Sequence, residues 1–205
     1  LHIDKKGNLW LVADGNRVGI FDTRWFTFKE VDIRLEHPSY QRSLKKIVED
    51  EQGNMMMVIG SVQLLTYDQK SNEFSAAHNF ITIQKEWGIV DIYQLPGTEK
   101  YVIGTHQGIM LYNNRTKEIN RAGHNPDNEQ IVQHFGQLKS AVHFMTDSSG
   151  RLWFDIWEDF PRIYMYDIRK NEIVLAKYDF LAAIGGYHEV HGFLQQMNGS
   201  IWING

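Results

Sequence analysis

The stretch from Asp147 to Trp153 reads Asp-Ser-Ser-Gly-Arg-Leu-Trp, a tight turn that leads straight into an apolar and aromatic run. This pairing of a glycine turn with an apolar run occurs five times along the chain. Its glycines follow one another at intervals of 46, 44, 53 and 49 residues, at Gly7, Gly53, Gly97, Gly150 and Gly199. A repeat of about 40 to 50 residues, built from short strands and turns, is the sequence signature of propeller blades.

Two further features recur in step with these glycines. The apolar runs occupy one equivalent place in each unit, at residues 9–10, 55–57, 101–103, 152–153 and 201–202. Four units then close with an aromatic residue followed by Asp or Asn, at residues 21–22, 67–68, 112–113 and 166–167. An Asp side chain can accept from backbone two residues on, and glycine accepts a positive φ, so the recurrent Asp-x-x-Gly predicts a turn.

The pattern within each complete unit predicts four consecutive antiparallel strands. In the second unit the apolar runs cover residues 44–48, 55–59, 64–67 and 74–77, with turn residues between them. Helix is disfavoured, because apolar positions do not recur at intervals of three and four and every run is interrupted early. We expect Trp10, Trp153 and Trp202 to occupy equivalent wedge positions between packed sheets.

The predicted fold is therefore all-β, a β-propeller fragment of about four and a half four-stranded antiparallel blades with little or no helix. The repeats cover approximately residues 1–43, 44–88, 89–140, 141–190 and, in part, 191–205, in one propeller segment. A closed ring needs about 4 to 8 blades, so four and a half should leave an open edge. We expect the segment to belong to a larger sensor chain.

Composition excludes several classes of protein. The 205 residues are 42% apolar, which is enough for a substantial core and argues against disorder. With 21 basic and 25 acidic residues scattered along the chain, the net charge of -4 disfavours binding to nucleic acid or directly to a membrane. The chain has no cysteine, so disulfides and thiol chemistry are excluded. No stretch has the length and apolar character of a membrane span or a signal peptide.

The repeat resembles the two-component regulator propeller repeat. Its third turn is matched by Lys-Ser-Asn-Glu-Phe at 70–74, Arg-Thr-Lys-Glu-Ile at 115–119 and Arg-Lys-Asn-Glu-Ile at 169–173. Its second hairpin is matched by residues 102–105, Gly108 and Tyr112. The resemblance covers essentially the whole chain. The second unit departs from it by lacking the tryptophan, and the fourth by a longer loop at residues 155–162.

The resemblance implies a function as well as a fold. Such repeats form the periplasmic sensor region of membrane-spanning hybrid histidine kinases in Gram-negative bacteria, which typically control genes for glycan uptake and breakdown. It therefore implies a periplasmic, non-enzymatic segment that recognises an oligosaccharide and signals to a cytoplasmic kinase in the parent chain. The expected partner is a second copy of the parent sensor, and only the parent meets the membrane.

The richest candidate for ligand binding is the loop at residues 155–162. It combines an aromatic ring, two carboxylates and a guanidinium, at Trp157, Glu158, Asp159 and Arg162. Propeller ligands usually meet the loops on one face, and these groups suit a sugar or a uronic acid. The alternative is that the inserted loop only packs on its neighbour.

Other long connections add aromatic and hydrogen-bonding candidates. They are Tyr40, Arg42, Trp87, Tyr187 and His188, with Arg34, His37, Lys85, His124, Asn125, Gln133, His134 and His191 as lesser ones. The alternative is that Trp87 and Tyr187 are wedges between blades and that the histidines are ordinary surface groups.

We predict no catalytic residue, no metal and no cofactor. The segment His-Glu-Val-His at 188–191 has its histidines three apart on an expected strand, whereas the metalloprotease motif needs them four apart on a helix. The neighbouring Glu158 and Asp159 do not naturally flank one glycosidic bond. Two other functions stay open: a scaffold that mediates dimerisation without a small ligand, and a glycan-cleaving propeller enzyme, which needs carboxylates converging from separate blades.

Overall fold

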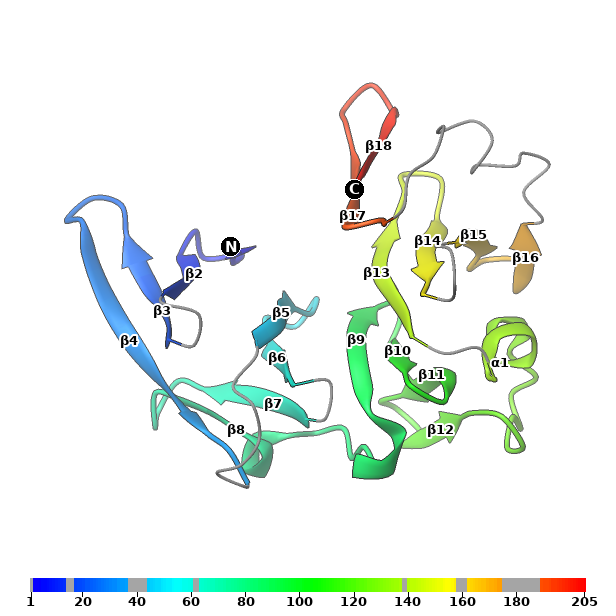
Figure 1. The fold of residues 1–205 in the computed structure, drawn as a ribbon, viewed down its shortest axis with the longest axis horizontal. Coiled ribbons are helices and arrows are strands. Elements are labelled where there is room, and N and C mark those ends of the chain that lie inside the picture. The colour runs from blue at the N-terminus through cyan, green and yellow to red at the C-terminus, as the bar shows by residue number, and fades with distance from the viewer. Residues whose placement is uncertain are drawn as a thin grey trace. The chain divides into compact units, whose positions relative to one another are not determined.

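The computed structural model describes residues 2–13, 17–36, 44–60, 63–137, 140–157, 162–174 and 189–205. The chain forms two compact units, residues 1–89 and 90–205, which are described in turn. Short strands joined by turns make up most of both units (Figure 1). No helix among the described residues is long and apolar enough to cross a membrane.

The first unit is built on one sheet of eight strands in the order β1-β2-β3-β4-β8-β7-β6-β5. The strands are β1 (His2–Ile3), β2 (Leu9–Ala13), β3 (Arg17–Asp22), β4 (Thr27–Arg34), β5 (Leu44–Glu49), β6 (Met55–Ile59), β7 (Gln63–Asp68) and β8 (Glu73–Ser75). Two one-turn helices follow, η1 (Ala76–His78) and η2 (Lys85–Trp87). Each half of the sheet is an antiparallel meander of four consecutive strands, as the repeat predicts.

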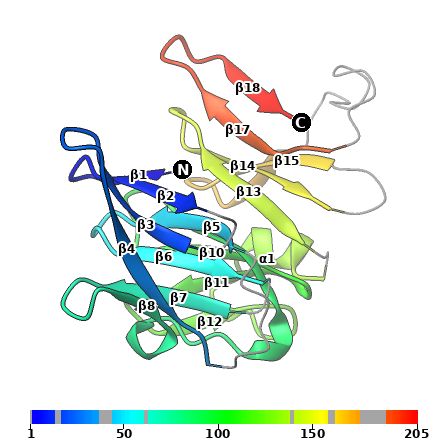
Figure 2. The same cartoon turned by 60° about the vertical axis from the view of Figure 1, so that its left-hand side comes forward.

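The two meanders are joined by their outer strands. The end of β4 runs parallel to β8, with Asp32, Ile33 and Arg34 opposite Glu73, Phe74 and Ser75. Figure 2 shows the long β4 strand reaching the edge of β8. This parallel pairing is the one departure from four-stranded antiparallel sheets in the described part of the first unit.

The core of the first unit lies between these meanders. Trp10 is 2% exposed, and its ring meets Tyr67 edge-on at 5.1 Å and Phe74 at 5.8 Å between centroids. Met55 and Met57 share this core. Met56, which stands three residues after Gly53 as Trp10 stands three after Gly7, takes the place of the tryptophan and is 1% exposed. The predicted wedge role of Trp10 is therefore confirmed.

The second unit contains three separate antiparallel sheets, in the orders β12-β11-β10-β9, β13-β14-β15-β16 and β17-β18. Their strands are β9 (Ile89–Gln94), β10 (Lys100–Thr105), β11 (Gly108–Asn113), β12 (Glu118–Asn120), β13 (Ala141–Thr146), β14 (Arg151–Ile156), β15 (Arg162–Asp167), β16 (Glu172–Val174), β17 (Gly192–Gln195) and β18 (Ile201–Asn204). One short helix, α1 (Gln130–Phe135), lies in the connection from β12 to β13.

The first two of these sheets pack on each other with α1 between them. The buried helix residues Ile131, Val132 and Phe135 share one core with residues of both sheets. The sheets approach closely at Gly104 in β10, where a Cβ would lie 1.8 Å from the carbonyl oxygen of Ala141 in β13. Glycine is therefore required at this position by contact with backbone.

The Asp-x-x-Gly turns form by the mechanism that the sequence suggests. The amides of Gly7, Gly53 and Gly150 donate to the carbonyl oxygens of Asp4, Asp50 and Asp147 at 2.9 to 3.1 Å. All three glycines have φ between 82° and 85°, the left-handed region that disfavours side chains. The carboxylates of Asp4 and Asp147 also accept from the indole nitrogens of Trp10 and Trp153 at 2.9 and 2.8 Å. The turn therefore anchors the tryptophan that follows it.

Three local expectations differ from the structure. Ala76 and Ala77 lie in η1, not at the end of a strand, because the Ser75 hydroxyl caps the turn by accepting from the Ala77 amide. Asp155 and Ile156 belong to β14, not to a loop. Trp202 is 60% exposed, whereas Trp153 is 8% exposed and packs against Phe193 of β17.

Candidate functional site

A pocket of about 440 Å³ lies between the β9–β12 sheet and the β13–β16 sheet, inside the second unit. It opens at the end of the strands where β10 begins and β11 ends. Lys100 is the first residue of β10, Asn113 the last of β11, and Tyr166 the last but one of β15. Its lining comprises Leu95, Thr98, Lys100, Asn113, Arg115, Thr116, Asp127, Glu129, Tyr166, Ile168 and Asn171.

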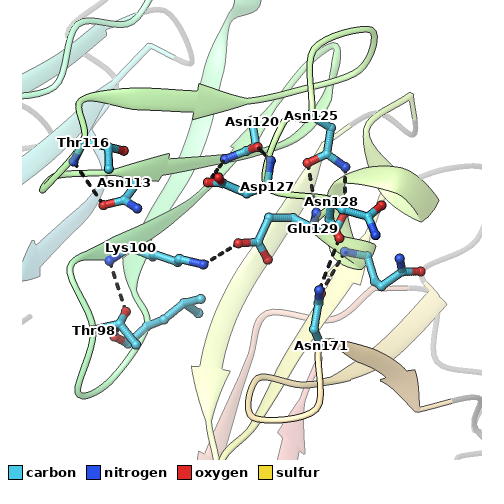
Figure 3. A network of polar contacts seen from close by, with 12 residues as sticks. Thr98, Lys100, Asn113, Thr116, Asn120, Asn125, Asp127, Asn128, Glu129 and Asn171 are labelled. Atoms are coloured by element: carbon cyan, nitrogen blue, oxygen red, sulfur yellow. Dashed lines mark hydrogen bonds and ion pairs between the residues drawn. The ribbon is translucent and has the colours of Figure 1, made fainter.

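Glu129 is the centre of the polar network in this pocket. Its side chain is 6% exposed and pairs with the ammonium of Lys100, whose side chain is 34% exposed. Asn125 holds the backbone of Glu129 at both ends, by accepting from its amide at 2.9 Å and donating to its carbonyl at 3.0 Å. Figure 3 shows Lys100 and Glu129 pointing at each other across the pocket. The ion pair therefore joins the start of β10 to the β12–α1 connection.

Asn171 ties the other wall to the same connection. It lies in the β15–β16 turn with φ 55°, accepts from the Gln130 amide at 2.8 Å and donates to the Asn128 carbonyl at 3.2 Å. The Tyr166 hydroxyl donates to the same Asn171 oxygen at 2.9 Å. Burial raises the pKa of Tyr166 far above its ordinary value, and the charge of Glu129 raises it further, so the hydroxyl stays protonated.

A second pair of polar side chains braces the β12–α1 connection. Asn120 is fully buried, donates to the Asp127 carboxylate at 2.9 Å and accepts from the Asp127 amide at 3.1 Å. The connection is thus held by side chains at Asn120, Asn125 and Asn171, in addition to a backbone bridge between Arg121 and His124. Side-chain amides that bond backbone on both sides fix a loop in one conformation.

Another polar cluster joins the inner strands β9, β13 and β14. His143 adopts φ 58°, a left-handed conformation that is uncommon outside glycine, at a register shift between β13 and β14. Its amide donates to Asp91 at 2.8 Å, and its ring Nδ1 lies 2.7 Å from Asp155. Asp91 is 2% exposed and Asp155 is fully buried, with its Oδ2 unpartnered.

Burial dominates the electrostatics of this second cluster. It raises the pKa of Asp155, the hydrogen bond and charge of His143 oppose that rise, and the charge of Asp91 adds to it. The two carboxylates come from separate sheets, as the hypothesis of a glycan-cleaving enzyme requires. Both are shielded from solvent, so neither is accessible to a glycosidic bond. Among the described residues, no group of three or more His, Asp or Glu is arranged to hold a metal ion.

None of the sequence-selected residues that the structure describes lines the pocket. Trp157 is 50% exposed, and Arg162 is exposed at the start of β15; the two flank the β14–β15 connection, at the opposite end of these strands from Tyr166. Trp87 is half-buried in η2. The remaining candidates, Tyr40, Arg42, Glu158, Asp159, Tyr187 and His188, lie outside the described residues, as does His37. Binding at all of these residues stays a prediction.

Several lesser candidates are paired locally. Lys85 pairs with Glu36 at 2.7 Å, His124 with Glu118 at 2.5 Å and His191 with Glu189 at 3.0 Å. Sequence reasoning missed the pocket residues Lys100, Glu129 and Asn171. A usable signal is the recurrence of tyrosine and asparagine five residues apart, at 67 and 72 and again at 166 and 171.

No protein-family model matches the sequence, and no curated protein matches it. Among solved structures, it is similar to the extracellular domain assigned to the hybrid two-component system BT4673 of B. thetaiotaomicron. The TM-score is 0.66 at 16% identity, over 99% of this chain and 27% of that chain. The corresponding domain of BT3049 has a TM-score of 0.64 at 19% identity, over 98% of this chain and 24% of that chain. The C-terminal WD40 domain of Sif2 has a TM-score of 0.55 at 8% identity, over 96% of this chain and 51% of that chain. WD40 repeats form propellers.

The chain has a β-propeller fold. Each four-stranded meander is one blade, so β1–β4, β5–β8, β9–β12 and β13–β16 are four blades and β17–β18 is half of another. The pocket therefore lies between the third and fourth blades of this chain. The chain spans about a quarter of the length of the BT4673 and BT3049 domains.

Proposed function

We propose that this chain is a sensing segment of an extracytoplasmic propeller in a membrane-spanning hybrid two-component sensor. One observation carries the proposal: the fold matches the extracellular domains of BT4673 and BT3049 over 98% to 99% of the chain. The segment itself is non-enzymatic and periplasmic in this proposal, and the histidine kinase lies elsewhere in the parent. A signal is passed when ligand binding favours one arrangement of the propeller over another.

The ligand in this proposal is glycan-derived. Two places offer groups that suit it: the exposed rim with Trp157 and Arg162, and the pocket between the third and fourth blades. Aromatic faces stack on sugar rings, and side-chain amides, carboxylates and cations bond hydroxyls. The volume of about 440 Å³ falls in the range of about 300 to 1,000 Å³ typical of small-molecule sites.

The scaffold hypothesis is the second candidate. Large apolar side chains are exposed at Trp25, Phe26, Leu194 and Trp202, with fractions of 75%, 80%, 65% and 60%. Trp25 and Phe26 are neighbours in the chain, and Leu194 lies opposite Trp202 in the β17–β18 pairing. Exposed apolar side chains that lie together are typical of surfaces that bind proteins. In that case the blades mediate dimerisation of the parent sensor and bind no small ligand.

A thermal-shift panel separates the two candidates. The purified protein is melted with each of a series of glycan-derived oligosaccharides, because a ligand that binds only the folded state raises the melting temperature. Sensing predicts a shift for at least one oligosaccharide. Loss of the shift in Trp157→Ala or Arg162→Ala assigns it to the rim, and loss in Arg115→Gln assigns it to the pocket. No shift across the panel favours the scaffold.

A further inference from the structure

The pocket between the third and fourth blades contains two acids whose carboxylates are already engaged. Glu129 pairs with Lys100 and lies 3.5 Å from the Tyr166 hydroxyl, and Asp127 accepts from Asn120. The amide of Asn171 is likewise used at both ends, with its oxygen accepting and its nitrogen donating. Each of these acceptor side chains therefore has at least one donor from the protein.

The donors in the same pocket retain unused capacity. Nothing in the described part of the chain accepts from the guanidinium of Arg115, an exposed residue in the β11–β12 turn. The ammonium of Lys100 has three N–H donors, and Glu129 is its one described side-chain partner. The side chain of Asn113 accepts from the Arg115 and Thr116 amides, which leaves its NH₂ group available. Figure 3 shows Lys100 and Asn113 side by side at this wall.

The guanidinium of Arg115, from which no described residue accepts, selects a ligand that accepts. The best acceptor for a guanidinium is an oxyanion, which can take two parallel N–H bonds from it. Arg115 and Lys100 bring two positive charges to the lining of the pocket. Glu129 pairs directly with Lys100, whereas Asp127, the second carboxylate of the lining, is bonded to Asn120 and not to Arg115. A neutral sugar, by contrast, brings hydroxyls that need acceptors as well as donors.

The rest of the pocket suits the body of a small polar molecule. Leu95, 2% exposed, and Ile168, half-buried, supply an apolar surface between polar walls. Apolar patches of this kind meet the C–H faces of a sugar ring, while polar groups at the rim fix its orientation. Exposed Thr116 adds a hydroxyl at the mouth of the pocket.

We infer that this pocket binds an acidic sugar, a mono- or disaccharide that carries a carboxylate or sulfate, with the oxyanion held by Arg115 and Lys100. The sugar part of this inference rests on the proposed function, and the oxyanion part rests on the pocket itself. The site is separate from the Trp157 and Arg162 rim, which lies at the other end of β14 and β15.

Calorimetric titration of the purified protein tests the inference. The probes are a glucuronic acid disaccharide, a galacturonic acid disaccharide, a sulfated hexosamine, the neutral disaccharides of matching length, and inorganic phosphate. We expect at least one acidic sugar to bind at least tenfold more tightly than its neutral counterpart. Raising the NaCl concentration should weaken that binding, because salt screens the charge attraction.

Two substitutions two residues apart provide the control. Arg115→Gln should weaken binding of the acidic sugar at least tenfold. Lys117→Gln removes an equally exposed cation that bonds Asn114 and lies outside the pocket, so it should leave the affinity unchanged within twofold. Both positions are exposed, and matching melting temperatures verify that both variants fold.

The remaining outcomes separate this inference from the proposed function. Equal binding of neutral and acidic sugars, or equal binding of phosphate alone, overturns the acidic-sugar site. Binding that survives Arg115→Gln but is lost in Trp157→Ala overturns the pocket and leaves sensing intact. Binding as expected, with no effect on autophosphorylation of the parent kinase, upholds the pocket and overturns the sensing role.

Discussion

The hydroxyl of Tyr166 donates to the side-chain oxygen of Asn171 over 2.9 Å, and the same bond joins Tyr67 and Asn72 at 3.2 Å. Both asparagines have φ 55°, and each donates to a backbone carbonyl preceding its blade, Asn171 to Asn128 and Asn72 to Glu30. We call this arrangement the tyrosine–asparagine clamp. It links the second blade to the first and the fourth blade to the connection that follows the third.

Removing the clamp in the fourth blade should destabilise the protein. Asn171→Ala deletes three hydrogen bonds, leaves the hydroxyl of buried Tyr166 without its main acceptor, and places alanine at a positive φ. We expect the free energy of unfolding in urea to fall by about 2 to 3 kcal/mol. Lys117→Ala is the matched control, because Lys117 has φ 60° at the same place in the third blade but bonds only Asn114 through its side chain. Lys117→Ala should lower the free energy of unfolding by less than about 1 kcal/mol. Equal losses in the two variants would show that the clamp contributes nothing to stability.

Two tryptophans at one place in the repeat should differ sharply in their effect on stability. Trp10→Ala removes a ring that is 2% exposed and packs on Tyr67 and Phe74, so the free energy of unfolding should fall by about 3 to 5 kcal/mol. Trp202→Ala removes a ring that is 60% exposed, and the change should stay within about 1 kcal/mol. Similar losses in urea melts of the two variants would contradict the burial that we describe.

Asp147 should make the protein more stable as pH rises from 2 to 5. Burial alone would raise its pKa, but hydrogen bonds from Ser149, Trp153 and Arg151, with the charge of Arg151, lower it to about 2. A carboxyl whose pKa is depressed by folding contributes stability above its unfolded pKa, and that contribution is lost as pH falls through the folded value. The free energy of unfolding should therefore rise less between pH 2 and pH 5 in Asp147→Asn than in wild type, and the two rises should differ by about 2 kcal/mol. Trp153→Phe removes one donor and should give an intermediate slope; a slope in Asp147→Asn equal to wild type would refute the assignment.

Asp155 should have the opposite effect. Its pKa is raised by burial despite the opposing hydrogen bond and charge of His143, so the folded protein holds this proton more tightly than the unfolded chain. Stability from this group is present at low pH and is lost as pH rises through the folded pKa. The asparagine of Asp155→Asn carries no charge at any pH in this range. The free energy of unfolding of the variant should therefore rise relative to that of wild type between pH 3 and pH 7. Thermal melts across this range check the sign, and a variant that becomes less stable relative to wild type as pH rises would contradict it.

The sequence predicted the repeated turns because their cause is local. An Asp side chain, a glycine at positive φ and the following tryptophan lie within seven residues, and the hydrogen bonds of Asp4 and Asp147 stay within that span. Strand positions in the second blade followed in the same way from the alternation of apolar runs and turn residues.

Features that depend on distant contacts were not predictable. The parallel pairing of β4 with β8 joins residues about forty positions apart, and no periodicity signals it. The exposure of Trp202 depends on which residues pack against its face rather than on its own repeat. The pocket draws on four short segments, at residues 95–100, 113–116, 127–129 and 166–171, none of which carries a recognisable motif alone.

The most direct test of the central claim, that the pocket between the third and fourth blades is the ligand site, is a crystal structure with the tightest-binding acidic sugar. We predict density for the oxyanion within hydrogen-bonding distance of Arg115 and Lys100, with the sugar ring against Leu95 and Ile168. Density at the rim of Trp157 and Arg162, with the pocket empty, would contradict the claim.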